Sequence, residues 1–222
     1  MLSRSCVLGL TALAACATAS SSQQQGTADA PSGHSDGPGG GDGLPPHIDA
    51  AIDAPPGSCA TPFTGALATW SFTGESGSQA QTAATAMATG VTAGPVSRSS
   101  ALTVASGVGS INSSGWATAA TLDSTKYYTF SVTPPSGCSM DLTKLSIDAK
   151  SSGTGPTMAV VATSADSYGQ TAAVSTTAAS MPTLTVTGAT GAIEIRVFGF
   201  AASGTGGTMR VQNTLSVTGS VH

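Results

Sequence analysis

Residues 127–133 read YYTFSVT, and this stretch decides the fold class. Tyr128, Phe130 and Val132 alternate with Tyr127 and three hydroxyl-bearing side chains. A period of two places one set of side chains on a buried face and the other on a face in contact with water, as in a β-strand. The sequence PPSG at residues 134–137 then ends the run. The stretch is therefore predicted to be a strand with one buried face.

The same alternation recurs along the rest of the chain from residue 59 onward. Strands with this pattern are expected at 141–150, 183–187 and 208–217, and shorter ones at 67–73, 101–105, 157–163 and 192–200. Residues 80–89 and 170–180 are rich in Ala and Thr without clear alternation, and each is compatible with a helical turn or a loop. Eight or more short strands bounded by Gly, Pro, Ser and Asp predict an all-β domain, with two antiparallel sheets packed as a β-sandwich.

The amino terminus has the features of an export signal. Residues 1–15 contain one early cation, Arg4, followed by an apolar run that is too short to span a bilayer. The run ends in Leu13-Ala14-Ala15-Cys16, which resembles the lipobox of bacterial lipoproteins. The resemblance implies that residues 1–15 are removed and that Cys16 carries the lipid that anchors the protein to a bilayer. The alternative is a simple secretory signal, with Cys16 an incidental residue and the protein released.

Residues 16–58 form the next segment, a predicted linker. It contains five of the chain's 11 acidic residues, no Lys or Arg, and almost no apolar side chains. Such a composition buries too little surface to fold and predicts a disordered, extended chain. His34 and His47 stand among Gly and Pro without neighbouring ligands, so no metal site is assigned to them. The folded domain is expected to occupy residues 59–222.

Two further cysteines, Cys59 and Cys138, lie in the predicted domain. Export would place them in an oxidising compartment, where a disulfide is stable. We therefore expect a Cys59–Cys138 bond, which would brace a core made largely of small side chains. The alternative is two separate buried thiols.

Composition excludes several classes of function. The chain has a net charge of -4 and no basic cluster, which argues against a nucleic-acid partner. The only histidine of the predicted domain is His222, and there is no CxxC or phosphate-binding glycine loop, so no catalytic residue, metal ligand or cofactor is predicted. Asp123 and Asp166 lie in turns, where a carboxylate caps backbone amides. Calcium bound by Asp123, Asp141 or Asp166 is compatible with such a sandwich, but no EF-hand-like spacing supports it.

The order of several short motifs resembles a group of secreted bacterial jelly-roll-like β-sandwich modules of poorly defined function. The motifs are Leu122-Asp123 leading into 127–134, Leu142 and Leu145, Gly155-Pro156, Ser164-x-Asp166-x-Tyr168, 196–200, and 206–213 with Gly219. The resemblance covers most of residues 67–221. It implies the sandwich fold and an extracellular setting, and it supplies no catalytic residues.

Candidate binding residues come from the aromatic side chains. Many β-sandwich modules bind glycans by stacking sugar rings on exposed aromatics. We expect seven of the ten aromatics to lie in the core, and we take Trp116, which follows a predicted turn, and Tyr127 as the exposed candidates for ligand binding. Glu194 and Arg196 share one face of a predicted strand, where they form either a structural ion pair over an aromatic or part of a recognition surface.

The sequence thus predicts a lipid-anchored protein of the cell envelope, at the outer membrane or the cell surface. Its expected role is binding without catalysis, with a glycan or a surface protein as the ligand. The alternatives are a structural or adhesive envelope component without a small ligand, and a glycan-processing enzyme, which would need two carboxylates converging in a cleft.

Overall fold

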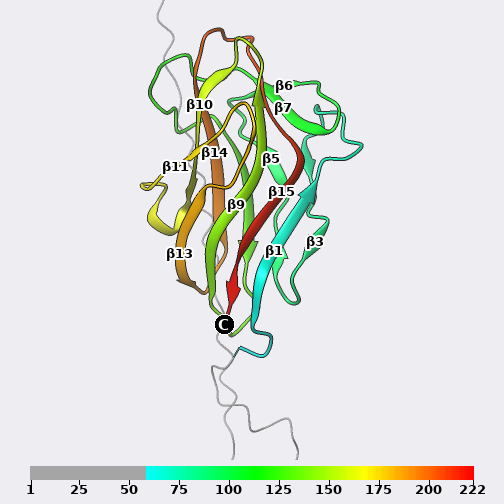
Figure 1. Cartoon of the computed structure of the whole chain (residues 1–222), viewed down its shortest axis with the longest axis vertical. Coiled ribbons are helices and arrows are strands. Elements are labelled where there is room, and N and C mark those ends of the chain that lie inside the picture. Colours follow the sequence, from blue (N-terminus) through cyan, green and yellow to red (C-terminus); the bar gives the residue numbers. More distant parts are fainter. Residues whose placement is uncertain (1–58) are drawn as a thin grey trace, which may run out of the picture. The chain divides into compact units, whose positions relative to one another are not determined.

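A computed structural model describes residues 59–222. This part of the chain is an all-β sandwich of two antiparallel sheets, which confirms the predicted fold class (Figure 1). Within it, no helix is long and apolar enough to cross a membrane. The predicted signal peptide (1–15), the lipidated Cys16 and the linker (16–58) lie outside the described residues.

Each sheet combines a few long strands with several short ones. The first sheet contains β1 (Phe63–Ser71), β3 (Ala86–Met87), β6 (Thr103–Ala105), β7 (Ser110–Ser114), β9 (Met140–Ser151), β12 (Ala179–Ser180), β13 (Thr183–Ala189) and β15 (Met209–Val221). The second contains β2 (Gln81–Thr82), β4 (Thr92–Ala93), β5 (Val96–Arg98), β8 (Tyr127–Thr133), β10 (Pro156–Thr163), β11 (Ala172–Val174) and β14 (Ile193–Ala202). One turn of 3-10 helix, η1 (Ser164–Asp166), follows β10.

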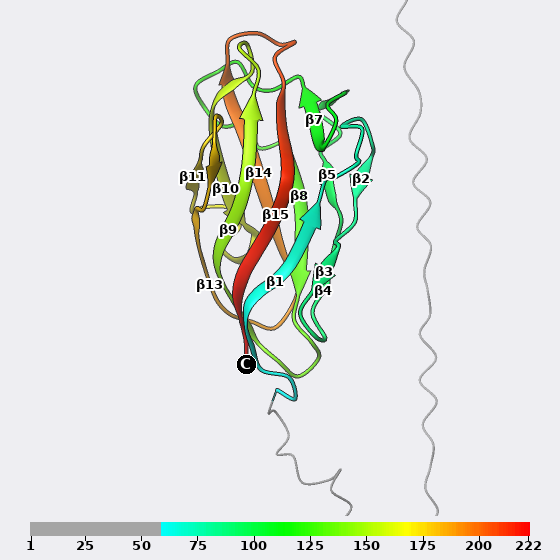
Figure 2. The same cartoon turned by 45° about the vertical axis from the view of Figure 1, so that its right-hand side comes forward.

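The order of the main strands is that of a jelly roll. The first sheet runs β13-β9-β15-β1 and the second runs β11-β10-β14-β8. Strands from the two ends of the chain therefore lie next to each other, as Figure 2 shows for β1 and β15. This arrangement of two interleaved Greek keys places β14 in the middle of the second sheet, between β8 and β10.

The predicted alternation holds in the long strands. Tyr128, Phe130 and Val132 are buried in β8, while Tyr127 and the hydroxyl side chains between them are half-buried on the outer face. In β15 the alternation continues across Asn213, where φ is +60° and the register with β9 shifts. The shift is a β-bulge, and it keeps the apolar side chains of both halves of β15 in the core.

Seven of the ten aromatic side chains are buried, as expected, but they include one of the two that were predicted to be exposed. Trp116 has only 1% of its surface exposed, so its predicted exposure is wrong. Gly115, just before it, has a φ of +82°, and the indole packs edge-on against the Tyr128 ring at 5.2 Å between centroids. Its Nε1 donates to the Ser113 carbonyl at 2.8 Å, so the indole N–H needs no water.

Short strands lie in the two Ala- and Thr-rich stretches that were expected to be a helical turn or a loop, and in one polar stretch. Residues 80–89 hold β2 and β3, and residues 170–180 hold β11 and β12, so neither stretch is a helix. Strand β7 has the polar sequence SINSS and was not expected from the sequence. In the structure it pairs with β15, and Ser110, Asn112 and Ser113 are buried.

The predicted disulfide between Cys59 and Cys138 is confirmed. The bond joins the first described residue to the loop between β8 and β9, across a sequence separation of 79 residues. A stable disulfide indicates an oxidising, exported environment.

Candidate functional site

The outer face of the second sheet carries a line of polar and aromatic side chains where β8 and β14 pair. Tyr127 lies opposite Phe198, Thr129 opposite Arg196, and Ser131 opposite Glu194. Side chains on one face of paired antiparallel strands interact directly. Glu194 and Arg196, which share a face of β14 as predicted, are therefore joined on that face by residues of β8.

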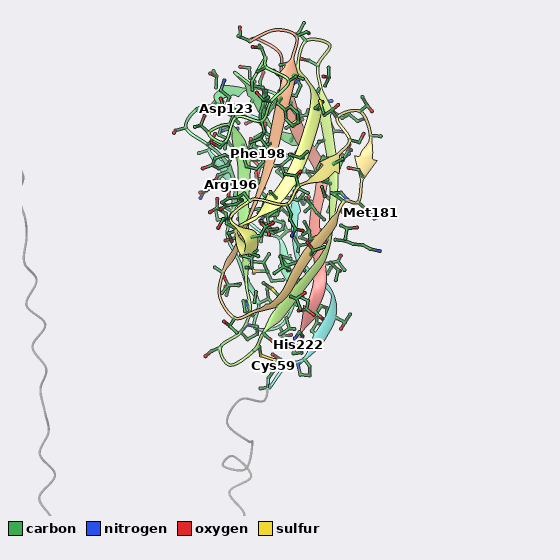
Figure 3. All side chains as sticks on the ribbon, turned by 90° about the vertical axis from the view of Figure 1, so that its left-hand side faces the viewer. Cys59, Asp123, Met181, Arg196, Phe198 and His222 are labelled. Carbon is green, nitrogen blue, oxygen red and sulfur yellow. A yellow bond between two sulfur atoms is a disulfide. The ribbon has the colours of Figure 1, made fainter. Side chains whose placement is uncertain are left out.

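On this face, the Arg196 guanidinium contacts two tyrosine rings. Its Cζ is 4.2 Å from the centroid of the Tyr127 ring and 4.1 Å from that of the Tyr168 ring. Its Nε donates to Oε1 of Glu194 at 2.7 Å. Both cation–π contacts and the ion pair are therefore made by one side chain. We call Tyr127, Tyr168, Glu194 and Arg196 the tyrosine–arginine cluster; Figure 3 labels Arg196 on this side of the domain.

A turn with two left-handed residues supplies Tyr168. After η1, Ser167 and Tyr168 have φ values of +58° and +63°, which is uncommon for residues other than glycine. The Tyr168 amide donates to the Thr163 carbonyl at 2.9 Å, and the Ser164 hydroxyl accepts the Glu194 amide at 2.9 Å. These bonds hold the turn against β14 and keep the second ring over Arg196.

The Glu194 carboxylate is held in its ionised form. Burial alone would raise the pKa of Glu194, but hydrogen bonds from Arg196 and from the Thr129 hydroxyl outweigh it, and the net pKa is lowered. Burial raises the pKa of Tyr168, and the adjacent carboxylate raises it further. The cluster therefore contains a fixed pair of opposite charges, Glu194 and Arg196, in contact with two tyrosine rings.

A shallow hollow of about 550 Å³ adjoins the cluster. Glu194 lines it together with the hydroxyl side chains of Ser97, Thr129, Ser131 and Ser164, and we call it the Glu194 hollow. A surface that combines hydroxyl groups, one carboxylate and neighbouring aromatic rings can form hydrogen bonds with, and stack against, a polyhydroxylated ligand.

Of the two aromatic candidates, the structure places only Tyr127 at this face. Tyr127 is half-buried and contacts both Arg196 and the edge of the Phe198 ring, at 5.7 Å between centroids. Trp116 is in the core and takes no part in the surface.

The acidic residues considered for calcium do not come together. Asp123 accepts the Thr125 amide at 2.9 Å and Asp166 accepts the Gln170 amide at 2.6 Å, which confirms the predicted capping roles. Asp141 accepts the Gly188 amide at 2.7 Å. Within residues 59–222 no three His, Cys, Asp or Glu side chains are close enough to hold a metal ion together.

A glycosidase needs two carboxylates in one hollow. A hollow of about 480 Å³ between η1 and β13 is lined by threonines, apolar side chains and one carboxylate, Asp166. The Glu194 hollow likewise has a single carboxylate. Neither supplies the pair of acids that the glycan-processing alternative requires.

Sequence reasoning missed Tyr168 and Thr129 as members of the site. Thr129 shares the alternation of Tyr127 and could have been placed on the same face from the pattern. Tyr168 reaches Arg196 only through the two left-handed residues of its turn, for which the sequence carries no glycine signal.

Comparisons of the chain with protein-family models, with curated proteins and with solved structures found no match.

Proposed function

We propose that the protein is a lipoprotein of the cell envelope whose β-sandwich binds a glycan, without catalysis, at the tyrosine–arginine cluster and the Glu194 hollow. The observation that carries the proposal is the arrangement around Arg196, with two tyrosine rings in contact with its guanidinium and a hydroxyl-lined hollow next to its ionic partner.

The composition of the site supports a sugar ligand. Sugars present hydroxyl groups around a ring with apolar C–H faces, so their sites combine hydrogen-bonding side chains with aromatic rings. Ser97, Thr129 and Ser131 supply hydroxyls, Glu194 supplies an acceptor, and the tyrosines supply rings. All are half-buried, so they are held in place by neighbours and still reach solvent.

The anchoring part of the proposal rests on the sequence. Leu13-Ala14-Ala15-Cys16 resembles a lipobox, and the disulfide indicates an exported environment. A lipid on Cys16 would hold the domain at the outer membrane or the cell surface.

A second candidate is a protein partner bound at the edge of the first sheet. Among the described residues, β13 pairs only with β9, so its other edge has backbone groups available to a further strand. This supports the structural or adhesive alternative.

The test is binding of the full chain, produced in an oxidising compartment and purified in detergent, to a panel of polysaccharides. We expect saturable binding that is lost in Tyr168→Ala and in Tyr127→Ala. Met181→Ala is the matched control, because Met181 is 70% exposed and lies away from Arg196 (Figure 3).

Absence of binding to every glycan by the folded wild type would contradict the proposal. Binding that survives both tyrosine substitutions would keep the ligand class and reject this site. Circular dichroism of each variant shows whether a loss of binding reflects unfolding.

A further inference from the structure

The two arginines in the strands of the second sheet use their guanidinium groups differently. In Arg98 of β5 all three nitrogens donate within the fold: Nε to Ser113 Oγ at 3.0 Å, Nη1 to the Gln79 carbonyl at 2.7 Å, and Nη2 to the Gly77 carbonyl at 3.1 Å. Nη2 also donates to the Asn112 carbonyl at 3.3 Å, so four of the five N–H donors of Arg98 bind within the fold and its role is structural.

Arg196 donates only from Nε, to Glu194. Within residues 59–222 neither Nη of Arg196 has a hydrogen-bond acceptor, and neither is among the buried polar atoms that lack a partner. Both Nη nitrogens are therefore in contact with solvent. A guanidinium carries five N–H donors, so the four on the two Nη nitrogens are available to a ligand that replaces solvent there.

The neighbours of Arg196 restrict how a ligand can approach it. The Tyr127 and Tyr168 rings lie 4.2 Å and 4.1 Å from Arg196 Cζ, and the Glu194 carboxylate accepts from Nε and repels a second anion there. The donors that remain for a ligand are those on the edge formed by the two Nη nitrogens. A planar group with two oxygens matches this edge by two parallel hydrogen bonds.

From this geometry we propose that the site recognises an acidic sugar, with the carboxylate of a hexuronate on the Nη edge of Arg196. The inference rests on the proposed glycan-binding function and deepens it by naming the ligand class. The adjoining Glu194 hollow supplies hydroxyl groups for the rest of the sugar. Arg196 is thus a specificity-determining residue and Glu194 is a positioning residue that fixes its orientation.

The distribution of charge supports a single ionic contact. The lysines Lys144 and Lys150 lie on β9, and Arg210 lies on β15, all in the first sheet. Lys126 is 3.9 Å from Asp123 and is partly neutralised by it. Each bound uronate would therefore contact a single cation, Arg196, so its binding should weaken only modestly as the salt concentration is increased.

The experiment measures wild-type binding to a matched pair of polysaccharides with the full chain in detergent. One is a polyuronate, and the other is the same polymer with its carboxyl groups reduced to primary alcohols. We expect the acidic form to bind about 10- to 100-fold more tightly, the effect of a charge-assisted, two-bond contact. A sulfated polysaccharide without carboxylates and poly-glutamate are the further arms.

The outcomes separate the two proposals. Equal affinity for the acidic and reduced polymers overturns the acidic-sugar inference and leaves the glycan proposal intact. Equal binding of the sulfated polymer replaces carboxylate recognition by general anion binding, and equal binding of poly-glutamate shows that no sugar is needed; both overturn the inference. No binding to any polymer rejects the proposed function itself.

Variants of Arg196 test the role of its two Nη nitrogens directly. Arg196→Lys keeps the positive charge but loses the two parallel donors, so the preference for the acidic polymer should fall to less than about 3-fold. Arg210→Lys is the matched control in the first sheet and should leave the preference unchanged. An unchanged preference for the acidic polymer in a folded Arg196→Lys variant would overturn the inference. If that variant misfolds, the comparison of the two polymers on the wild type still tests the inference.

Discussion

The Glu194 carboxylate makes two kinds of contact that favour its ionised form. It accepts hydrogen bonds from Thr129 and Arg196, and it lies beside a positive charge. Since 37% of its side chain is exposed, solvent screens the ion pair and limits its contribution to stability.

This predicts a pH-dependent effect of Glu194→Gln. The folded-state pKa of Glu194 lies below its usual value of about 4.3, so the carboxylate contributes stability above that pH and the contribution is lost as the pH falls through the lowered folded-state pKa. The free energy of unfolding of the wild type should exceed that of Glu194→Gln by up to about 1 kcal/mol at neutral pH, and the difference should shrink as the pH falls through the lowered folded-state pKa of Glu194. Urea unfolding from pH 7 to 2.5 measures it.

Glu75→Gln serves as the control for this titration, because the Glu75 side chain accepts no hydrogen bond from the rest of residues 59–222. A difference between wild type and Glu194→Gln that stays constant over the whole pH range would contradict the assignment.

The burial of Trp116 depends on the absence of a side chain at Gly199. A Cβ at Gly199 would lie 3.0 Å from Trp116 Cε3, from Met209 Cε and from Pro156 Cγ. The strand β14 thus leaves room for the indole by using glycine at this position.

We therefore predict that Gly199→Ala destabilises the domain by about 1–3 kcal/mol through overpacking. Gly191→Ala is the control, because a Cβ there meets no atom within 4 Å. Urea unfolding followed by tryptophan fluorescence compares the two, and equal midpoints would show that the Trp116 pocket adjusts freely.

Part of the candidate site could be predicted from single residues. The alternation of β14 brings Glu194 and Arg196 to one face, and the same rule places Tyr127 outward. The burial of Trp116 could not be read from its flanking turn, because the indole finds both its ring partner, Tyr128, and its hydrogen-bond acceptor only after the sheets have packed.

At the scale of elements, the disulfide joins Cys59 to the loop that follows β8. In the unfolded chain the bond closes a long loop and so lowers the entropy of the unfolded state. This favours the folded state.

Reduction is expected to lower the free energy of unfolding by about 4 kcal/mol. Guanidinium unfolding with and without dithiothreitol measures the change. The variant with both Cys59→Ser and Cys138→Ser should match the reduced wild type and should not respond to the reductant. Identical unfolding midpoints for oxidised and reduced wild type would contradict a stabilising role.

The long strands were predictable, and of the short ones β6 lies within the strand expected at 101–105, but several others were not predicted. Strands β8, β9, β13 and β15 each carry enough alternating residues to define a buried face. Strands β2, β3 and β12 have two residues each, which is too few for a period to be visible. Strand β7 buries Ser110, Ser113 and Asn112, and polar residues become strand residues there because β15 supplies a pairing edge.

At the scale of the whole molecule, the proposed anchor and the proposed binding site use different parts of the chain. Cys59 and His222 lie together at one end of the domain, whereas Arg196 and Phe198 lie away from that end (Figure 3). The proposed binding residues are therefore separate from the point at which the described chain begins.

The anchoring proposal predicts that Cys16→Ser converts a membrane-associated protein into a released one. An acylated cysteine provides the buried methylene groups that hold a protein at a bilayer, and serine at this position cannot form the thioether. Fractionation of cells expressing each form, with labelled palmitate, measures the change. Release of the wild type itself, without label, would favour the secretory alternative.

The connection between Cys59 and Cys138 also determines how the domain would carry a mechanical load. Phe63, at the start of β1, pairs with Val221, so a pull on an unbridged amino terminus would peel β1 from β15 one bond at a time. The bridge diverts tension past β1 to Cys138, in the loop between β8 and β9, and β8 is hydrogen-bonded to β14 along six residue pairs. If the proposed anchor and the proposed glycan site both hold, part of the load would pass in shear through β8 and β14, the strands that carry Tyr127 and Arg196.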